Sequence, residues 1–151
     1  MPGLVGEHAW AGGGQVRVLV EATEWGDREL ISTVLRRAGY TTACCPGPEG
    51  SGQRCTLAAG QGCGAAEQAD VVVHALRRSD HRNLEALRAL RQRLPGTPVV
   101  VEVPRSLVER HPDDYDGCVV VDPPLTEAAL LAAIAAALED SGGGGDRSDA
   151  T

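Results

Sequence analysis

Four of the five cysteines in this 151-residue chain lie within 20 residues of one another, and thiols bind soft metals and carry redox chemistry. They are Cys44, Cys45, Cys55 and Cys63. Four thiolates could form a tetrahedral zinc site or hold an iron–sulfur cluster. Common zinc motifs, however, use cysteine pairs about two to four residues apart, whereas nine and seven residues separate the last three here. Metal binding, reversible thiol chemistry and a structural role therefore stay open, and the structural role is favoured because free cysteine often behaves as a small buried apolar residue.

The adjacent pair limits any cysteine site. Cys44 and Cys45 fall in a predicted strand, where neighbouring side chains point to opposite faces. One of them is therefore expected in the core, which leaves three thiol ligands and requires His74 or His81 as the fourth. Cys118 lies inside a valine-rich run and is predicted to be a core residue.

A second set of polar side chains stands at the ends of apolar runs, where a sheet edge could bring them together. Glu21, His74, Glu102 and Asp122 each close or follow such a run. A histidine beside carboxylates could act as a base or a metal ligand. An enzyme of this kind would need Glu21, His74 and Glu102 within hydrogen-bonding reach of one another. We interpret the acids as solvated strand ends and His74 as a core or strand-end histidine, so no catalytic residue and no enzyme activity is predicted.

Five short apolar runs would position these groups. The runs are residues 16–20, 40–45, 70–76, 98–103 and 117–121. They lack polar alternation and are separated by helical segments, which is typical of a parallel sheet covered by helices on both faces. Apolar residues at helical spacing, with polar caps or glycine at the ends, mark the helices. These signals are Leu30, Ile31, Val34 and Leu35 before Gly39; Leu84, Leu87, Leu90 and Leu94 after Ser79 or Asp80; a short segment at 106–110; and Leu130, Leu131, Ile134 and Leu138 after Thr126.

Three segments differ from this pattern. Residues 1–15 and 141–151 are rich in glycine and lack an apolar period, so we expect a disordered N-terminal arm and a disordered Gly-rich tail. Between them, residues 16–140 are predicted to form one folded domain. Residues 46–66 interrupt it as a Cys- and Gly-rich insertion, because glycine and proline recur there too often for a regular helix.

Several short motifs, in this order, resemble the response-regulator receiver family. Gly39 and Tyr40 are similar to the family's entry to its second strand, and residues 69–73 to the segment before its phosphoacceptor. Residues 94–101 are similar to the joint between its third helix and fourth strand, and residues 123–126 to its Lys-Pro joint. The resemblance covers about residues 16–140. It implies a three-layer α/β/α fold, receiver- or flavodoxin-like, whose five-stranded parallel sheet has the order 2-1-3-4-5.

The same resemblance implies a site that has lost its chemistry. Receivers need acids for Mg²⁺, an aspartate that accepts the phosphoryl group, a Ser or Thr, and a lysine, since hard oxygens bind Mg²⁺ and positive charge offsets the transferring group. The matching positions hold Glu21 and Ala22 for the acid pair, Ala75 for the phosphoacceptor, Val103 for the hydroxyl and Pro123 for the lysine. The chain contains no lysine at all. We therefore expect a degenerate receiver that is not phosphorylated on aspartate.

Composition excludes further classes. A net charge of −7 argues against binding to the phosphate backbone of nucleic acids. No apolar stretch reaches the roughly 20 residues that span a bilayer, and residues 1–10 lack the pattern of a signal peptide, so we expect a cytoplasmic protein without membrane contact. No dinucleotide motif, P-loop or flavin loop follows the first apolar run. The absence of lysine and phenylalanine indicates a GC-rich bacterial genome.

The functional prediction is a non-catalytic signalling module that acts on a protein partner and needs no cofactor. By resemblance, the surface around helices four and five, from Leu107 to Leu138, would make the contact, including that of a homodimer. The arginine-rich stretch at 77–93 is interpreted as a solvated face. The alternative is a metal-binding or thiol-redox sensor that uses Cys45, Cys55 and Cys63, with zinc or an iron–sulfur cluster as its cofactor.

Overall fold

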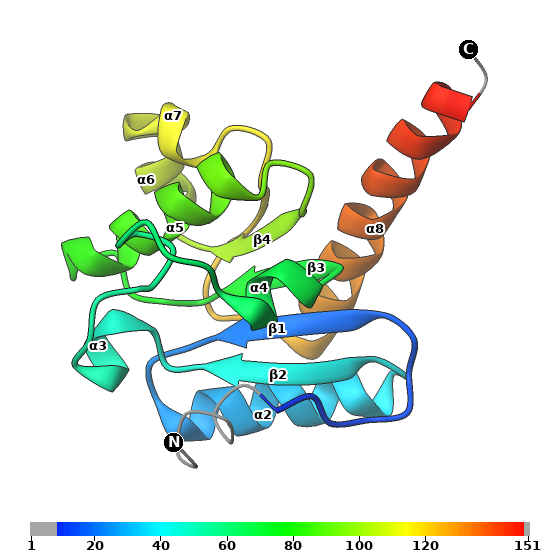
Figure 1. The fold of residues 1–151 in the computed structure, drawn as a ribbon, viewed down its shortest axis with the longest axis horizontal. Helices are drawn as coiled ribbons and strands as arrows, with labels where there is room; N and C mark the ends of the chain where they lie inside the picture. The colour runs from blue at the N-terminus through cyan, green and yellow to red at the C-terminus, as the bar shows by residue number, and fades with distance from the viewer. Residues whose placement is uncertain (1–8, 150–151) are drawn as a thin grey trace.

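Five parallel strands form a single sheet with helices on both faces (Figure 1). The structure, a computed structural model, describes residues 9–149, with side chains described as far as Ser141. The strand order, β2-β1-β3-β4-β5, is the predicted one. The strands are β1 (Arg17–Glu21), β2 (Thr41–Cys45), β3 (Val71–His74), β4 (Val99–Glu102) and β5 (Val119–Val121). The helices are α2 (Trp25–Arg37), α3 (Gly47–Ser51), α4 (Gly64–Gln68), α5 (His81–Arg93), α6 (Arg105–Arg110), α7 (Pro112–Tyr115) and α8 (Glu127–Asp149).

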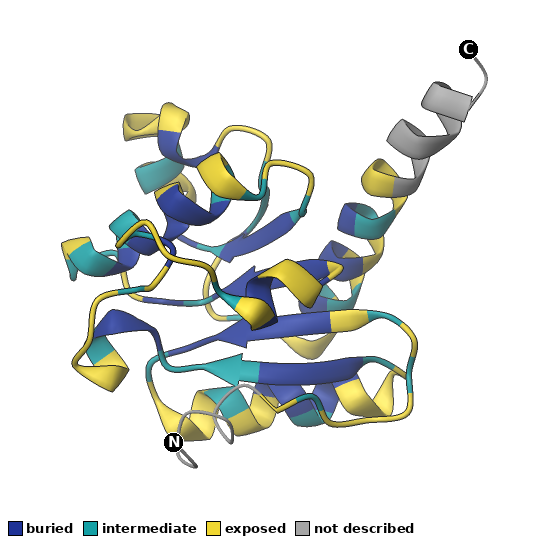
Figure 2. Ribbon diagram, in the orientation of Figure 1, coloured by how far each residue is buried: buried dark blue, intermediate teal, exposed yellow. Residues whose placement is uncertain are grey.

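Alternate side chains of each strand enter two separate cores, one on either face of the sheet. Val18 and Val20 of β1 pack with α2 and α8 in the first core, whereas Leu19 packs with α4, α5 and α7 in the second. The strands are therefore buried on both faces, and the exposed residues lie on the outer surfaces of the helices (Figure 2). This double burial explains why the strand sequences are continuous runs of valine rather than alternating patterns.

The predicted helix signals coincide with the helix ends of the structure. Gly39, after the end of α2, has a φ of 97°, a left-handed conformation that glycine adopts without strain. Asp80 caps α5, since its Oδ1 accepts a hydrogen bond from the backbone nitrogen of Arg82 at 2.9 Å. Thr126 accepts a hydrogen bond from the backbone nitrogen of Ala129 at 3.1 Å and so caps α8.

Two short helices lie at the insertion predicted at 46–66: α3 is within it, and α4 begins in it and ends beyond it at Gln68. Helix α3 contacts α5. Arg54 pairs with Glu85 of α5 at 3.1 Å, and Arg93 donates to the backbone oxygens of Leu57 and Gln61 at 3.3 and 2.7 Å. The insertion is thus fastened to α5 by arginine side chains, which supply several donors to backbone carbonyls.

The two terminal segments are described in part. Ala11 forms an antiparallel bridge with Thr42 of β2, and the indole nitrogen of Trp10 donates to Gln68 at 2.8 Å, so residues 9–15 lie against the domain. Helix α8 continues to Asp149 and includes most of the segment predicted as a tail. The remaining residues of the predicted arm and tail, 1–8 and 150–151, lie outside the described residues. Within residues 9–149, no helix combines the length and apolarity needed to cross a membrane.

Arginines near the start of α5 and along it hold α7 in place. Asp114 of α7 is 7% exposed and accepts hydrogen bonds from Arg78 at 3.1 Å and Arg88 at 2.9 Å. Arg78 also donates to the Tyr115 hydroxyl at 2.9 Å, and Arg91 donates to the Asp114 carbonyl at 2.6 Å. Burial alone would raise the pKa of Asp114, but the hydrogen bonds from the two guanidinium groups outweigh it and lower the pKa. These arginines, interpreted from the sequence as a solvated face, thus join α5 to α7.

Replacing Asp114 with asparagine tests this clamp. Because the folded-state pKa of Asp114 is lowered, its contribution to stability is present above its ordinary pKa of about 4 and is lost as the pH falls through the folded-state value. We expect Asp114→Asn to reduce the free energy of unfolding by about 1–2 kcal/mol at neutral pH, with the difference shrinking below about pH 4. Urea denaturation measures both. Asp113→Asn, at an exposed neighbouring carboxylate, is the control and should change stability by under about 0.5 kcal/mol; equal effects of the two variants would contradict the clamp.

Candidate functional site

A buried hydrogen bond joins the ends of the two central strands. Glu21 ends β1 and His74 ends β3, and the parallel register places them side by side. Nδ1 of His74 lies 2.7 Å from Oε1 of Glu21, and the two residues are 4% and 8% exposed. The chain leaves β1 toward α2 on one face and leaves β3 toward α5 on the other, so the pair stands where the connections diverge. This is the position at which open α/β sheets bind ligands.

The pair gives His74 a defined orientation. A carboxylate oxygen accepts hydrogen bonds, so Nδ1 of His74 is assigned as the donor and the other ring nitrogen, Nε2, is available to a ligand. Within the described residues, Nε2 makes no hydrogen bond. The backbone reinforces the arrangement, since the nitrogen of Ala75 donates to the carbonyl oxygen of Glu21 at 2.8 Å. A carboxylate-oriented imidazole of this kind can hold a ligand or move a proton.

The other two predicted polar residues are bound elsewhere. Glu102 follows Val100 at the same face of β4, toward α2 and α8, and its Oε2 accepts a hydrogen bond from the backbone nitrogen of Leu125 at 3.0 Å. Burial raises the pKa of Glu102, and nearby Asp27 adds to this, although the bond from Leu125 opposes it. Asp122 accepts a hydrogen bond from the backbone nitrogen of Arg105 at 2.8 Å and so caps α6. The structure therefore brings Glu21 and His74 together, and Glu102 does not join them.

The positions matched to a receiver's phosphorylation site carry no groups for phosphotransfer other than Glu21. Ala22 and Val103 are buried at 1% and 3% exposure, Ala75 is half-buried against the first core, and Pro123 is exposed. The single acid of the set, Glu21, is already occupied by His74. Within residues 9–149, no three His, Cys, Asp or Glu side chains are arranged to hold a metal ion.

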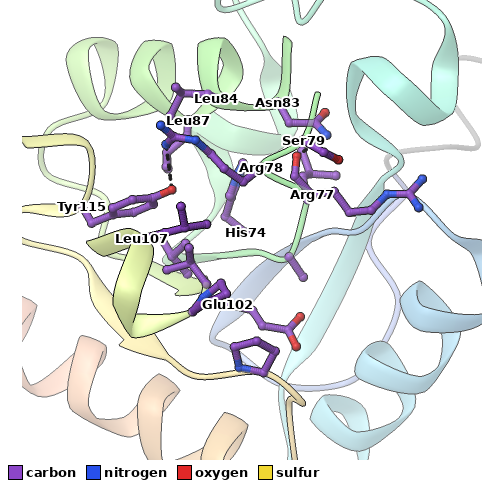
Figure 3. A pocket seen from close by; sticks show the side chains of 16 residues that line it. His74, Arg77, Arg78, Ser79, Asn83, Leu84, Leu87, Glu102, Leu107 and Tyr115 are labelled. Atoms are coloured by element: carbon purple, nitrogen blue, oxygen red, sulfur yellow. Dashed lines mark hydrogen bonds between the residues drawn. The ribbon is translucent and has the colours of Figure 1, made fainter. Parts of the chain in front are cut away.

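A cavity of about 350 Å³ opens beside His74 at the same edge of the sheet. Figure 3 shows its side chains, which come from the ends of β3 and β4 and from α5, α6 and α7. Three of the degenerate receiver positions, Ala75, Val103 and Pro123, line it. The other apolar wall residues include Leu84, Leu87, Val101 and Leu107, and the polar ones include His74, Arg78, Ser79, Asn83 and Tyr115. The volume falls in the range of sites for small molecules, about 300–1,000 Å³.

The polar wall of this cavity is held in place by hydrogen bonds. Arg78 reaches across to the Tyr115 hydroxyl, whereas Arg77 extends away from both (Figure 3). Asn83 is 1% exposed, and its Nδ2 donates to the Arg77 carbonyl at 2.9 Å and to Glu49 at 3.2 Å. Among the described residues, Oδ1 of Asn83 is one of two buried side-chain oxygens without a hydrogen-bond partner. Sequence analysis missed Asn83 and Tyr115, because only the packing of α5 and α7 over the sheet edge brings them to the cavity.

Three of the cysteines line a second cavity, of about 120 Å³, on the other side of Glu21. Cys45, Cys55 and Cys63 share its wall with Glu21. Cys44 points to the opposite face of β2, where its sulfur lies 3.0 Å from the Ser32 hydroxyl, as expected for adjacent residues of a strand. The fifth cysteine, Cys118, packs against the second core. The structure therefore brings together the three thiols that the sequence proposed as ligands.

Two thiols of this second cavity, those of Cys45 and Cys55, have raised pKa values. Burial, followed by the charge of Glu21, raises the pKa of Cys45 to about 12, and burial also raises the pKa of Cys55. A thiol is a poor nucleophile when it is protonated. All five cysteines are free, and His81, the other predicted fourth ligand, is exposed at the start of α5. The metal and redox hypotheses stay predictions.

Comparison with known proteins places this geometry in a known fold. No protein-family model and no curated protein sequence matches the chain. One solved structure that resembles it is NtrX from Brucella abortus, with a TM-score of 0.67, 21% identity and coverage of 89% of this chain. A response regulator receiver domain from Clostridium thermocellum matches with a TM-score of 0.62, 17% identity and 83% coverage. The chemotaxis protein CheY4 from Vibrio cholerae matches with a TM-score of 0.60, 19% identity and 82% coverage. The match spans 29% of the NtrX chain, but 95% and 98% of the other two. The chain therefore has the fold of response regulator receiver domains.

Proposed function

We propose that this chain is a signalling module of receiver fold that acts through protein contacts and is not phosphorylated on aspartate. The observation that carries the proposal is the replacement of the reacting group. Ala75 stands at the phosphoacceptor position at the end of β3, and its methyl group cannot accept a phosphoryl group. The fold supports a signalling role, because the response regulator receiver and CheY4 structures share it over nearly their whole length.

The rest of the sheet edge supports the same conclusion. Transfer of a phosphoryl group needs Mg²⁺ and positive side chains to offset charge on the transferring oxygens. A single carboxylate remains at the acid pair, and it is buried against His74 rather than open to a cation. Pro123 stands at the position of the receiver lysine, and the chain contains no lysine at any position. A nearby acid such as Glu102 does not compensate, because its carboxylate binds the backbone at Leu125.

The proposal extends to the setting of the protein. We propose a cytoplasmic module without a bound cofactor, enzymatic activity or affinity for nucleic acids. The net charge of −7 supports the last point, since a negative protein is repelled by phosphate backbones. The burial and high pKa of the Cys45 thiol favour a structural role for the cysteine cavity over a redox role.

Incubation with acetyl phosphate and Mg²⁺ tests the absence of phosphotransfer. We expect intact-mass spectrometry to show no added phosphoryl group, because Ala75 offers no acceptor and no cation neutralises the donor. A receiver domain that is phosphorylated by acetyl phosphate, treated in parallel, confirms that the reagent is active. A stoichiometric mass increase that hydroxylamine removes would reveal an acyl phosphate and would contradict the proposal.

The contact with a partner is proposed on the surface from Leu107 to Leu138. β5 is an edge strand there, and Val119 and Val120 are only half-buried, which leaves a strand edge open to a partner. Helix α8 adds exposed alanines beside this edge, among them Ala132. Small exposed side chains let another surface approach closely.

Light scattering after size-exclusion chromatography tests whether the partner is a second copy. We expect a dimer that Ala132→Arg converts to monomer, because a charged side chain at an exposed position blocks the contact without disturbing the core. Trp25→Arg is the control, since Trp25 is 69% exposed at the start of α2, outside the proposed surface. A dimer that survives Ala132→Arg but is lost in Trp25→Arg would place the contact on α2 instead.

A further inference from the structure

The cavity beside His74 shares Leu107, Tyr115 and Pro123 with the proposed contact surface, but its other walls lie outside that surface. It has the features of a binding site for a small molecule: a floor of strand ends, apolar walls and few polar groups. It lies where a receiver would carry its phosphorylation site, since Ala75, Val103 and Pro123 line it. Loss of the carboxylates and the lysine has left apolar surface at the carboxyl ends of β3 and β4. Ligands of open α/β sheets bind at this edge.

One wall of the cavity carries a positive charge that its neighbours do not balance. Asp114 is shared by two guanidinium groups, those of Arg78 and Arg88, so this trio keeps one net positive charge. Arg78 lines the cavity, and Arg88 does not. Only the Nη1 nitrogen of Arg78 is used, in its bonds to Asp114 and Tyr115, which leaves other guanidinium N–H groups for an acceptor. A guanidinium in such a place binds a carboxylate well.

The acids near the cavity do not cancel this charge at the wall. Glu21 is separated from the cavity by His74 and lines the cysteine cavity instead. Glu102 lines the cavity at its edge, away from Arg78 in Figure 3, and its carboxylate binds the backbone of Leu125. Arg77, the other cation of the lining, pairs with Glu49 at 2.8 Å. Arg78 is thus the cation that an acidic ligand would meet.

The rest of the surface selects against a bare inorganic anion. Leu84, Leu87, Val101 and Leu107 form apolar walls that a small hydrated ion leaves unfilled. The imidazole of His74, fixed by Glu21, supplies one further polar contact through Nε2. Burial of an apolar body against these walls removes apolar surface from water and so favours binding.

We propose that this cavity binds a small carboxylic acid with an apolar body, its carboxylate on Arg78 and its body against the leucines of α5 and α6. The ligand would fix α5, α6 and α7 relative to the ends of β3 and β4. The inference does not rest on the proposed function, because benzoate binding is measured directly and does not require that the protein be phosphorylated or unphosphorylated.

Benzoate is a suitable probe, followed by shifts of backbone and methyl NMR signals on the full chain. We expect millimolar benzoate to shift the signals of Leu87, Val101 and Leu107 in a saturable manner. Benzyl alcohol has the same ring without the carboxylate and should bind at least about tenfold more weakly, the loss expected for one charge-assisted hydrogen bond. Inorganic phosphate should cause no saturable shift at these residues.

Two arginine variants form a matched pair for the carboxylate contact. Arg78→Gln and Arg88→Gln each remove one partner of Asp114, but only Arg78 lines the cavity. We expect Arg78→Gln to weaken benzoate binding about tenfold or more and Arg88→Gln to leave it within about twofold of the wild type. Both variants are checked for folding by the same spectra, and Arg78→Lys replaces Arg78→Gln if the latter does not fold.

The outcomes separate this inference from the proposed function. Saturable benzoate shifts that depend on Arg78 support the site whether or not acetyl phosphate modifies the protein. Absence of saturable shifts at Leu87, Val101 and Leu107, equal binding of benzoate and benzyl alcohol, or equal weakening by the two variants would each overturn it.

Discussion

The hydrogen bond between His74 and Glu21 fixes both side chains at the carboxyl ends of β1 and β3, the edge of the sheet that carries the candidate site. A buried carboxylate or imidazole without a partner costs several kcal/mol, so each of these side chains needs the other once β1 and β3 lie side by side. Their pairing engages one carboxylate oxygen of Glu21 with the imidazole. The pair also lies between two cavities: His74 lines one together with leucines and Arg78, and Glu21 lines the other together with three cysteines.

Around this pair, a chain without lysine or phenylalanine uses other means to hold its layers together. Valine, leucine and alanine fill both cores. Arginine side chains hold the short segments that bury few apolar residues. Arg93 donates a hydrogen bond to the insertion, and Arg78 and Arg88 bind α7 through Asp114. Because two arginines share one aspartate, the clamp that orders α7 also leaves positive charge on a cavity wall. Structure and binding chemistry at this edge therefore come from the same contacts.

Local signals made much of this fold predictable, and contacts distant in sequence account for what could not be foreseen. Valine runs and the caps at Asp80 and Thr126 depend on neighbours in sequence, so the strands and the long helices followed from them. The sheet order came instead from the resemblance to receiver domains. The partner of His74 depends on the register of two strands 53 residues apart, and the cavity depends on how α7 folds over the sheet. The sequence predicted that Glu102 ends a strand, but not where its side chain would bind. Its carboxylate accepts a hydrogen bond from Leu125, 23 residues away, and only the folded position of β4 brings the two together.

The most direct test of the central claim is the tautomer and Mg²⁺ response of His74, read from long-range ¹H–¹⁵N NMR spectra of the histidine rings. The account predicts a His74 ring protonated at Nδ1, with a slowly exchanging proton that is lost in Glu21→Ala, which removes the acceptor, and no change in its signals on addition of Mg²⁺. A ring protonated only at Nε2, or His74 signals that move with Mg²⁺ in a saturable manner, would show that Glu21 is free to bind a cation and would contradict the account.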